Sequence, residues 1–497
     1  MHLHSLLNSV RTVARLALLP LTAILFLIGA VAPAAAQSTC TPDWLPMLGT
    51  GPRDENAFCS LVADLDGPGD DGPTLVIGGR GLVLTHRNHT WEVLGTGLAG
   101  DVYALAMYDP DGDGPLPASL IAGGNFSINS QSCGVARYDR TNNTWAPMTF
   151  GISYPYGVRA LAVFDPDGSG PLPPMLYAGG DFATINGAST PYLIKYDGTS
   201  WTSGGAFNNV VRTLSVFDAD GDGPLPAQLY ATGTFSNVGV PAARIARFDG
   251  ASWSAVGSGV SGTIYQLNVA DTDGPGPQPA RLVASGSFSV VGNSSLTNLA
   301  AWNGTTWSAI GTSLNGAVET AGLYDPDGPG PVPPRLVVAG WFFNPSLPYQ
   351  ARMFEWTGSA WSAIDNAATL PAVITGFDVD GLGRDSLVVA GGFEQFGGVN
   401  AYHAAAWDGT GWKTLNTGVD DYIYSIAQFD PDGAGGAPPR LFIGGAFRTI
   451  GGQSIRGLAQ WDGTAWSTIG SGFAATAGSP SAMCVYDDDG PGPHAQS

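Results

Sequence analysis

The sequence predicts an all-β protein that folds as a single β-propeller of about eight four-stranded blades. A composition rich in turn residues, a recurring Trp and two further motifs of the same period carry this prediction. Gly and Pro account for 71 and 37 of the 497 residues, which is too many breakers for a helical protein. Because 44% of residues are hydrophobic and 10% are aromatic, a disordered chain is excluded. Gly has no three-residue period, so collagen is excluded too.

The repeat is marked most clearly by a Trp, which in four of the eight repeats follows Gly-Thr-x. It occurs at Trp91, Trp145, Trp201, Trp253, Trp307, Trp361, Trp412 and Trp466. A D-x-D-G motif recurs with it, beginning at Asp64, Asp109, Asp165, Asp218, Asp271, Asp325, Asp378, Asp430 and Asp487. A third motif, of the form G-G-x-F, includes residues 123–126, 179–182 and 444–447. A period of about 50 residues fits a propeller blade, whereas separate sandwich domains need about 100 residues each.

Each repeat contains four short runs of strand-like sequence, named strands a to d in chain order. In the third repeat these are Val158 to Phe164, Met175 to Ala178, Tyr192 to Tyr196, and the run that starts at Trp201. The runs are apolar or alternating and end at Gly, Pro, Asn or Asp. The predicted repeats are 59–97, 102–151, 158–205, 210–259, 263–313, 317–365, 372–418 and 423–472, followed by a partial strand at 481–486.

The first 36 residues have the features of an export signal. Arg11 and Arg15 precede an apolar run from Leu16 to Ala30, and Ala34 to Ala36 match a small-residue cleavage site. We therefore predict a signal peptide at 1–36, a propeller domain at 37–497, and a secreted protein (extracellular, cell surface or periplasm). An uncleaved membrane anchor is the alternative, although the apolar run is short for a spanning helix.

Thirteen of the 14 tryptophans fall in two repeat positions, on strands c and d. A ligand-binding aromatic residue seldom recurs once per blade in register, so these positions predict packing between blades. Trp341 alone lies outside them, directly after the glycines of its repeat. It is therefore the one Trp that we expect to have a surface role.

These motifs resemble those of known propellers. A strand that ends in Gly-Gly, then an aromatic-Asp turn, then Trp, is similar to the kelch repeat and the galactose-oxidase propeller. The fuller pattern also resembles secreted, uncharacterised bacterial repeat proteins and fungal cortical polarity-marker proteins, over about residues 44–487. The D-x-D-G loop differs from kelch and is similar to the calcium loops of FG-GAP propellers. Asp378, Asp380 and Asp385 match that pattern best.

Acidic residues outnumber basic ones by 41 to 20, and most of them lie in the a–b loops and c–d turns. In a propeller these connections emerge on one face, which is therefore expected to be acidic. Two loops, Asp109/Asp111/Asp113 and Asp218/Asp220/Asp222, supply three carboxylates each, the oxygen ligands that calcium prefers. We expect calcium in these loops and at Asp378–Asp385. The alternative is that Asp and Gly simply form the turns.

Four cysteines remain after cleavage, an even count that favours two disulfides in an exported protein. Spacing alone leaves three pairings open. We predict Cys40–Cys484, which would join the two chain ends, and Cys59–Cys133, since both residues belong to the face opposite the acidic loops. Cys40–Cys59 is the alternative.

The sequence favours a binding or cell-surface interaction module over an enzyme. Histidine is scarce, and neither a G-x-S-x-G nor an H-E-x-x-H motif occurs. The net charge of −21 argues against nucleic acid or anionic membrane as a partner. We expect a monomer without a membrane span that binds a protein or a glycan. Two alternatives stay open: an extracellular glycan-active hydrolase or lyase with carboxylates at the propeller channel, and a purely structural surface protein.

Overall fold

The computed structural model describes residues 59–469 except for short segments within that range. These segments are 64–73, 79–82, 88–89, 112–117, 152–156, 168–171, 186–187, 190–191, 220–225, 271–279, 291–295, 328–331, 343–351, 366–369, 372, 378–384, 416–417, 430–439 and 464. The predicted signal peptide and the partial strand at 481–486 lie outside the described residues. In the described part every regular element is a strand, and no helix has the length and apolar character to cross a membrane.

The described residues form eight four-stranded antiparallel sheets. The first four are β1–β4 (Cys59–Ala63, Thr74–Gly78, Val83–Arg87, Thr90–Val93), β5–β8 (Leu98–Tyr108, Ser119–Ile128, Gln131–Asp139, Thr144–Pro147), β9, β10, β13 and β14 (Gly157–Phe164, Met175–Asp181, Leu193–Tyr196, Trp201–Ser203), and β15–β18 (Val211–Phe217, Gln228–Gly233, Ile245–Phe248, Trp253–Ala255). The next four are β19–β22 (Val260–Ala270, Arg281–Val290, Thr297–Trp302, Trp307–Ser308), β23–β26 (Ala317–Tyr324, Arg335–Trp341, Met353–Trp356, Trp361–Asp365), β27, β28, β31 and β32 (Val373–Phe377, Ser386–Ala390, Ala404–Trp407, Trp412–Thr414), and β33, β34, β37 and β38 (Ile423–Phe429, Arg440–Gly445, Leu458–Trp461, Trp466–Thr468). Three two-stranded hairpins lie in b–c connections: β11–β12 (Thr184–Ile185, Ala188–Ser189), β29–β30 (Gln395–Phe396, Val399–Asn400) and β35–β36 (Thr449–Ile450, Gln453–Ser454).

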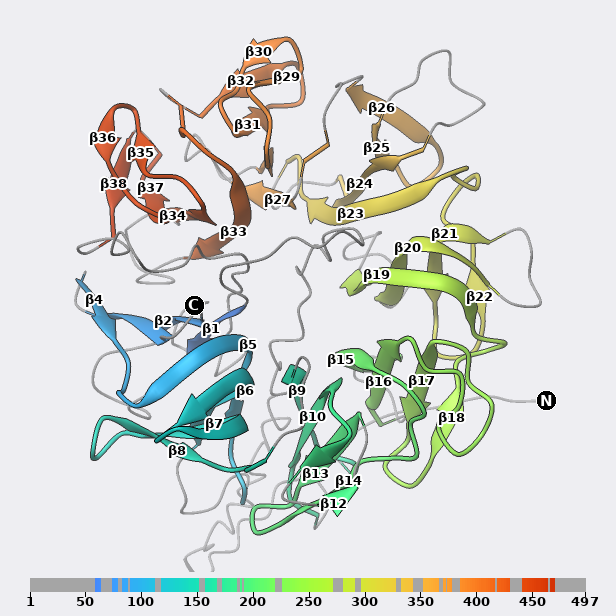
Figure 1. Cartoon of the computed structure of the whole chain (residues 1–497). Helices are drawn as coiled ribbons and strands as arrows, with labels where there is room; N and C mark the ends of the chain where they lie inside the picture. Colours follow the sequence, from blue (N-terminus) through green and yellow to red (C-terminus); the bar gives the residue numbers. More distant parts are fainter. Residues whose placement is uncertain are drawn as a thin grey trace, which may run out of the picture.

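Each four-stranded sheet is one blade, and the blades are numbered 1 to 8 in chain order. Within every blade the strands pair as a simple antiparallel meander from a to d. Figure 1 shows the blades arranged around a common centre, with the first strand of each blade innermost and the last outermost. This arrangement confirms the predicted all-β propeller. The strands of blade 3 begin and end within a few residues of their predicted positions.

Strand-d tryptophans pack between blades, as the sequence predicts. The indole N–H of Trp253 donates to the carbonyl of Gly204, which lies three residues after the Trp of the preceding blade. The same bond recurs at Trp145–Leu94, Trp307–Val256, Trp361–Ile310 and Trp466–Leu415. These five bonds fix the register between neighbouring blades, and the buried indoles provide apolar contact at the same place. The indole N–H groups of Trp201 and Trp412 donate no such bond to the described residues.

Apolar clusters of the described residues lie between neighbouring blades. One apolar cluster contains Val76 and Val83 of blade 1, a set of residues from blade 2, and Phe442, Leu458 and Ile469 of blade 8 and the segment just after it. Residues more than 350 positions apart in the chain therefore share one core, since Val83 and Phe442 belong to the same cluster.

Candidate binding face

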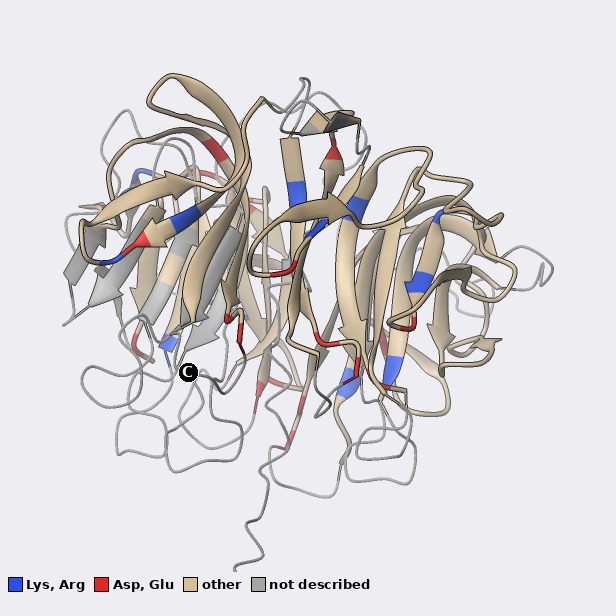
Figure 2. Cartoon of the chain, turned by 90° about the horizontal axis from the view of Figure 1, so that it is seen from below, with Lys and Arg blue, Asp and Glu red and all other residues tan. Residues whose placement is uncertain are grey.

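The antiparallel meander divides the connections between two faces. The a–b loops and c–d turns emerge on one, here called the acidic face, and the b–c and d–a connections on the other. In Figure 2 many of the acidic residues lie toward the lower edge of the sheets. The opposite face carries all four aromatic side chains that are exposed in the described part of the chain, and we call it the aromatic face. They are Phe150, Trp341, Tyr402 and Tyr422, with exposures of 46%, 60%, 46% and 43%.

Carboxylates of the c–d turns on the acidic face close the turns themselves. Asp197 Oδ1 accepts the backbone N–H groups of Thr199 and Ser200, at 2.8 and 2.7 Å. Asp139, Asp249 and Asp408 do the same in their blades. Hydrogen bonds to the ionised form hold the pKa of all four carboxyl groups below their usual value. Asn303 makes the equivalent turn in blade 5 without a charge.

The a–b loops repeat a second arrangement of carboxylates. Asp165 Oδ1 accepts the N–H of Asp167 at 3.1 Å, and Asp167 Oδ2 accepts the N–H of Leu172 at 3.2 Å. Asp325, Asp327 and Val332 repeat this pattern in blade 6. The remaining oxygen, Oδ1 of Asp167 and of Asp327, is buried and receives no hydrogen bond from the described residues. A buried anionic oxygen of this kind suits a cation or a water molecule.

Only part of the predicted calcium set lies within the described residues. The N–H of Asp111 donates to Asp109 Oδ1 at 3.2 Å, which is the loop geometry described above. Asp218 lies directly after β15. Asp113, Asp220, Asp222, Asp378 and Asp380 lie outside the described residues. Asp385 contacts the preceding blade, where its Oδ2 accepts the N–H of Asp325 at 3.2 Å. Among the described residues no three His, Cys, Asp or Glu side chains are grouped to hold a metal.

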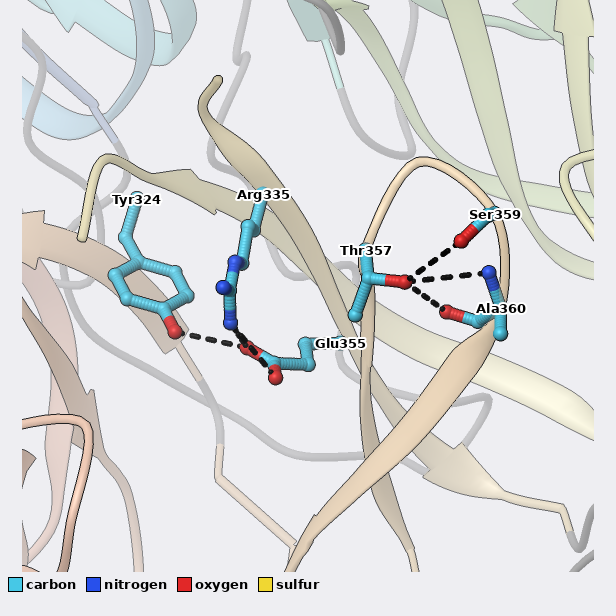
Figure 3. Close-up of polar contacts among 6 residues, drawn as sticks. All are labelled: Tyr324, Arg335, Glu355, Thr357, Ser359 and Ala360. Atoms are coloured by element: carbon cyan, nitrogen blue, oxygen red, sulfur yellow. Dashed lines mark hydrogen bonds and ion pairs between the residues drawn. The ribbon is translucent and has the colours of Figure 1, made fainter. Parts of the chain in front are cut away.

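Blade 6 also contains an ion pair near the acidic face (Figure 3). Arg335 Nη1 lies 2.9 and 3.0 Å from the two carboxylate oxygens of Glu355, and Tyr324 donates to Glu355 Oε2 at 2.8 Å. Burial, followed by the Glu355 charge, raises the pKa of Tyr324. The three residues come from β23, β24 and β25, so the group joins three adjacent strands. In the next turn Thr357 takes the place of the usual Asp and bonds to both backbone groups of Ala360.

On the aromatic face the innermost strands carry a repeated β-bulge. The pairing of β5 with β6 shifts between Val102 and Ala104, which leaves Tyr103 outside the ladder. The same shift occurs in β9, β15, β19, β23 and β33. We call the bulged residues the inner rim; they are Tyr103, Arg159, Arg212, Tyr265, Glu319 and Tyr424. All are half-buried, and bulges commonly re-aim a side chain at a functional site.

Members of the inner rim contact one another across blades. The Arg159 guanidinium lies over the Tyr103 ring, 5.9 Å from its centroid. Burial, then the positive charge of Arg159, lowers the pKa of Arg212. Burial raises the pKa of Glu319, while burial and then the Glu319 charge raise the pKa of Tyr265. The rim is therefore a partly desolvated ring of charges and phenols, basic at blades 3 and 4 and acidic at blade 6.

A second repeated position on this face lies just before strand c. Its backbone has positive φ at Tyr192 (68°), Arg244 (64°) and His403 (75°), and in blade 5 the positive φ occurs at Asn298 (65°), the second residue of β21. Blade 8 has Gly457 instead, with φ of 68°. An L residue is strained in this conformation and Gly is not. Four blades thus keep a polar or aromatic side chain where Gly would cost less, which is a feature of functional sites.

Trp341 joins this set at the end of β24. It is the most exposed aromatic residue described, and the Arg352 guanidinium stacks 4.2 Å from its ring centroid. The predicted surface position of Trp341 is therefore confirmed. The inner rim was not predicted from the sequence. The signal was one polar or aromatic residue at a fixed position, five before the last residue of each innermost strand, in an otherwise apolar run.

Of the four cysteines, Cys40 and Cys484 lie outside the described residues. Cys133 is a free, buried thiol that donates to the carbonyl of Val135 at 3.0 Å, so the expected Cys59–Cys133 bond is not formed in this structure. The reason is that the two cysteines belong to strands at different distances from the centre of the propeller. Cys59 begins the innermost strand of blade 1, whereas Cys133 lies on the third strand of blade 2, and two strand spacings amount to about 10 Å.

Comparisons with known proteins found a family model for part of the chain and solved structures of low sequence identity. The family model for the Rax2 C-terminal beta propeller domain matches residues 83–254. Among solved structures, the extracellular domain of the hybrid two-component system BT4673 of B. thetaiotaomicron is 13% identical with a TM-score of 0.34, over 87% of this chain and 46% of that one. An ancestral GH74 enzyme is 12% identical with a TM-score of 0.26, over 82% of this chain and 61% of that one. The chain thus spans about half the length of the first of these structures. No curated protein matches it.

Proposed function

We propose that this chain is an exported β-propeller that acts as a binding module through its aromatic face. One observation carries the proposal: the exposed aromatic side chains, the bulged inner rim and the strained positions before strand c all lie on the same face. Half-buried charged groups with shifted pKa values and strained backbone positions are found most often at functional sites. The opposite face uses its carboxylates largely to close turns.

The proposed scaffold is a ring of eight blades closed between blades 8 and 1. The shared cluster of Val76, Val83, Phe442, Leu458 and Ile469 supports closure, because it covers the sheet faces that an open ring would expose. Ile469 also lies three residues after Trp466, the position from which other blades accept an indole hydrogen bond. A closed ring holds the inner-rim side chains of neighbouring blades in fixed relation to one another.

We further propose that calcium stabilises the acidic face. The buried Oδ1 atoms of Asp167 and Asp327, which receive no hydrogen bond from the part of the chain that the structure describes, support cation binding in loops of this type. The three-carboxylate loops at Asp109–Asp113 and Asp218–Asp222 remain the preferred sites, together with Asp378, Asp380 and Asp385. The role of the ion would be structural, since the aromatic face lies at the other ends of the same strands.

A screen of immobilised polysaccharides and peptides tests the binding function. The wild-type protein should bind one class of ligand, and Trp341→Ala with Tyr422→Ala should weaken that binding at least tenfold. Leu172→Ala is the matched control, because Leu172 is 49% exposed but lies in an a–b loop on the acidic face. Equal loss in the control and the aromatic variant would contradict the proposal. Release of new reducing ends from a bound polysaccharide would indicate that the protein is a hydrolase or lyase and not only a binding module.

A further inference from the structure

Three arginines come together where blades 3 and 4 meet on the aromatic face. Arg159 and Arg212 occupy the inner rim of neighbouring blades, and Arg244 precedes strand c of blade 4. We propose that this arginine cluster binds the acidic groups of a polysaccharide that carries carboxylates or sulfates. The proposal rests on the binding function of the aromatic face and adds the chemical class of the ligand.

The backbone places Arg212 and Arg244 in one row across blade 4. Arg212 bulges between Val211 and Thr213, and Val211 pairs with Gly233 on the next strand. The N–H of Gly233 donates to the carbonyl of Arg244 at 3.0 Å. The three strands thus meet at one level of the sheet, and both arginines belong to that level.

Arg159 joins the row from blade 3. Val211 of blade 4 packs so closely on blade 3 that a Cβ added to Gly179 would lie 2.6 Å from its Cγ1. Gly179 pairs with Ala160, the neighbour of Arg159. Both Arg159 and Arg244 act electrostatically on Arg212, and each favours its deprotonated form. The three positive charges are therefore near enough to repel one another.

The chain offers few basic residues to make such a cluster. It has 20 Lys and Arg against 41 Asp and Glu, yet three arginines share this half-buried position, and the charge of Asp181 acts on Arg212 in the opposite sense to the two other arginines. Repulsion among like charges destabilises the ligand-free protein, and a bound anion removes that repulsion. Planar guanidinium groups also bind carboxylate and sulfate oxygens in pairs.

The surroundings of the cluster fit a sugar chain better than a protein. The Tyr103 ring lies under Arg159, and Tyr192 occupies the strained position before strand c of blade 3. Such rings can pack against the apolar face of a sugar while arginine binds its acidic group. The aromatic side chains that contact one another on this face, His403, Tyr422 and Tyr424, belong to blades 7 and 8 and not to the arginine cluster, whereas a stable protein interface needs a contiguous apolar centre.

Binding of defined polymers tests the proposal, with polygalacturonate for carboxylates, dextran sulfate for sulfates and dextran as the neutral polymer. Isothermal titration in buffer of fixed ionic strength should show binding to at least one acidic polymer and none to dextran. Arg212→Gln with Arg244→Gln should weaken that binding at least tenfold. Arg448→Gln is the matched control, because Arg448 is exposed on the b–c side of blade 8. It should bind as the wild type does.

Several results would overturn the proposal. Equal binding of dextran would remove the role of charge but leave the binding function of the aromatic face intact. Equal losses in the Arg448 control and the double variant would indicate non-specific attraction. Binding of polyglutamate as tight as that of polygalacturonate would indicate an acidic protein as the ligand. If Arg212→Gln prevents folding, Arg244→Gln alone gives the same test, since Arg244 lies outside the strands.

Discussion

Truncation of Trp253 to Ala removes one of the repeated contacts between blades. The Trp253 side chain is 9% exposed and donates to the Gly204 carbonyl of blade 3 at 2.7 Å. Its ring also lies 4.9 Å from that of Phe207 and 5.3 Å from that of Phe248. Trp253→Ala should destabilise the fold by about 3–5 kcal/mol, the usual cost of removing a large buried aromatic residue. With an m-value of about 3 kcal/mol per M, the urea midpoint falls by about 1–1.7 M.

Trp253→Phe separates the two parts of this loss. It keeps an aromatic ring but removes the indole N–H, so it should cost about 1 kcal/mol through the hydrogen bond to Gly204, plus a smaller packing term. Trp341→Ala is the exposed control and should leave the midpoint unchanged. Urea titrations followed by far-ultraviolet circular dichroism measure all three variants. An unchanged midpoint for Trp253→Ala would refute the role of this Trp in packing between blades.

Further expectations concern glycine, pH and calcium. Gly205→Ala should destabilise by about 1–3 kcal/mol, because its Cβ would lie 2.8 Å from Trp253 Nε1, whereas Gly411→Ala, with nothing within 4 Å, should be neutral in the same titration. Hydrogen bonds, for Asp408 chiefly the one from Lys413, lower the carboxyl pKa values of Asp197, Asp249 and Asp408 below the ordinary 3.8. The stabilisation that these ionised carboxylates give to the folded state is therefore complete above pH 3.8 and is lost as the pH falls below that value. Thermal melts from pH 6 to pH 2 should show this loss, and Asp249→Asn, which copies the Asn303 turn, should weaken it; a flat profile would contradict it. Calcium added after treatment with a chelator should raise the melting temperature, because a ligand that binds only the folded state stabilises it. An unchanged melting temperature at millimolar calcium would contradict the proposed calcium sites.

The period of the sequence was enough to predict the architecture. The Trp spacing and the turn residues predicted four strands per repeat, and the structure has them in eight sheets. The packing of the tryptophans between blades followed from their recurrence in register. These features could be predicted because each depends on local pattern and is repeated, so that no single position had to be interpreted alone.

The candidate site was predicted only in part. Trp341 stood out because it broke the repeat, but Arg159 and Arg212 did not, since a charged residue in a strand is ordinarily an outward-facing position. Their proximity depends on a bulge and on the angle between blades, neither of which is visible in the sequence. The predicted Cys59–Cys133 bond is not formed in the structure, for the same kind of reason. The prediction considered on which face of the propeller each cysteine lies, but not how far each lies from the propeller centre.

Hydrogen–deuterium exchange with and without the ligand found in the screen tests the central claim most directly. We predict slower exchange in peptides that cover the middle of β5, the starts of β9 and β15 and the end of β24, because these segments carry inner-rim residues and Trp341. Peptides that cover the c–d turns at Asp197 and Asp249 should exchange at the same rate in both states. Protection confined to those turns or to the a–b loops would place the ligand on the acidic face and contradict the account.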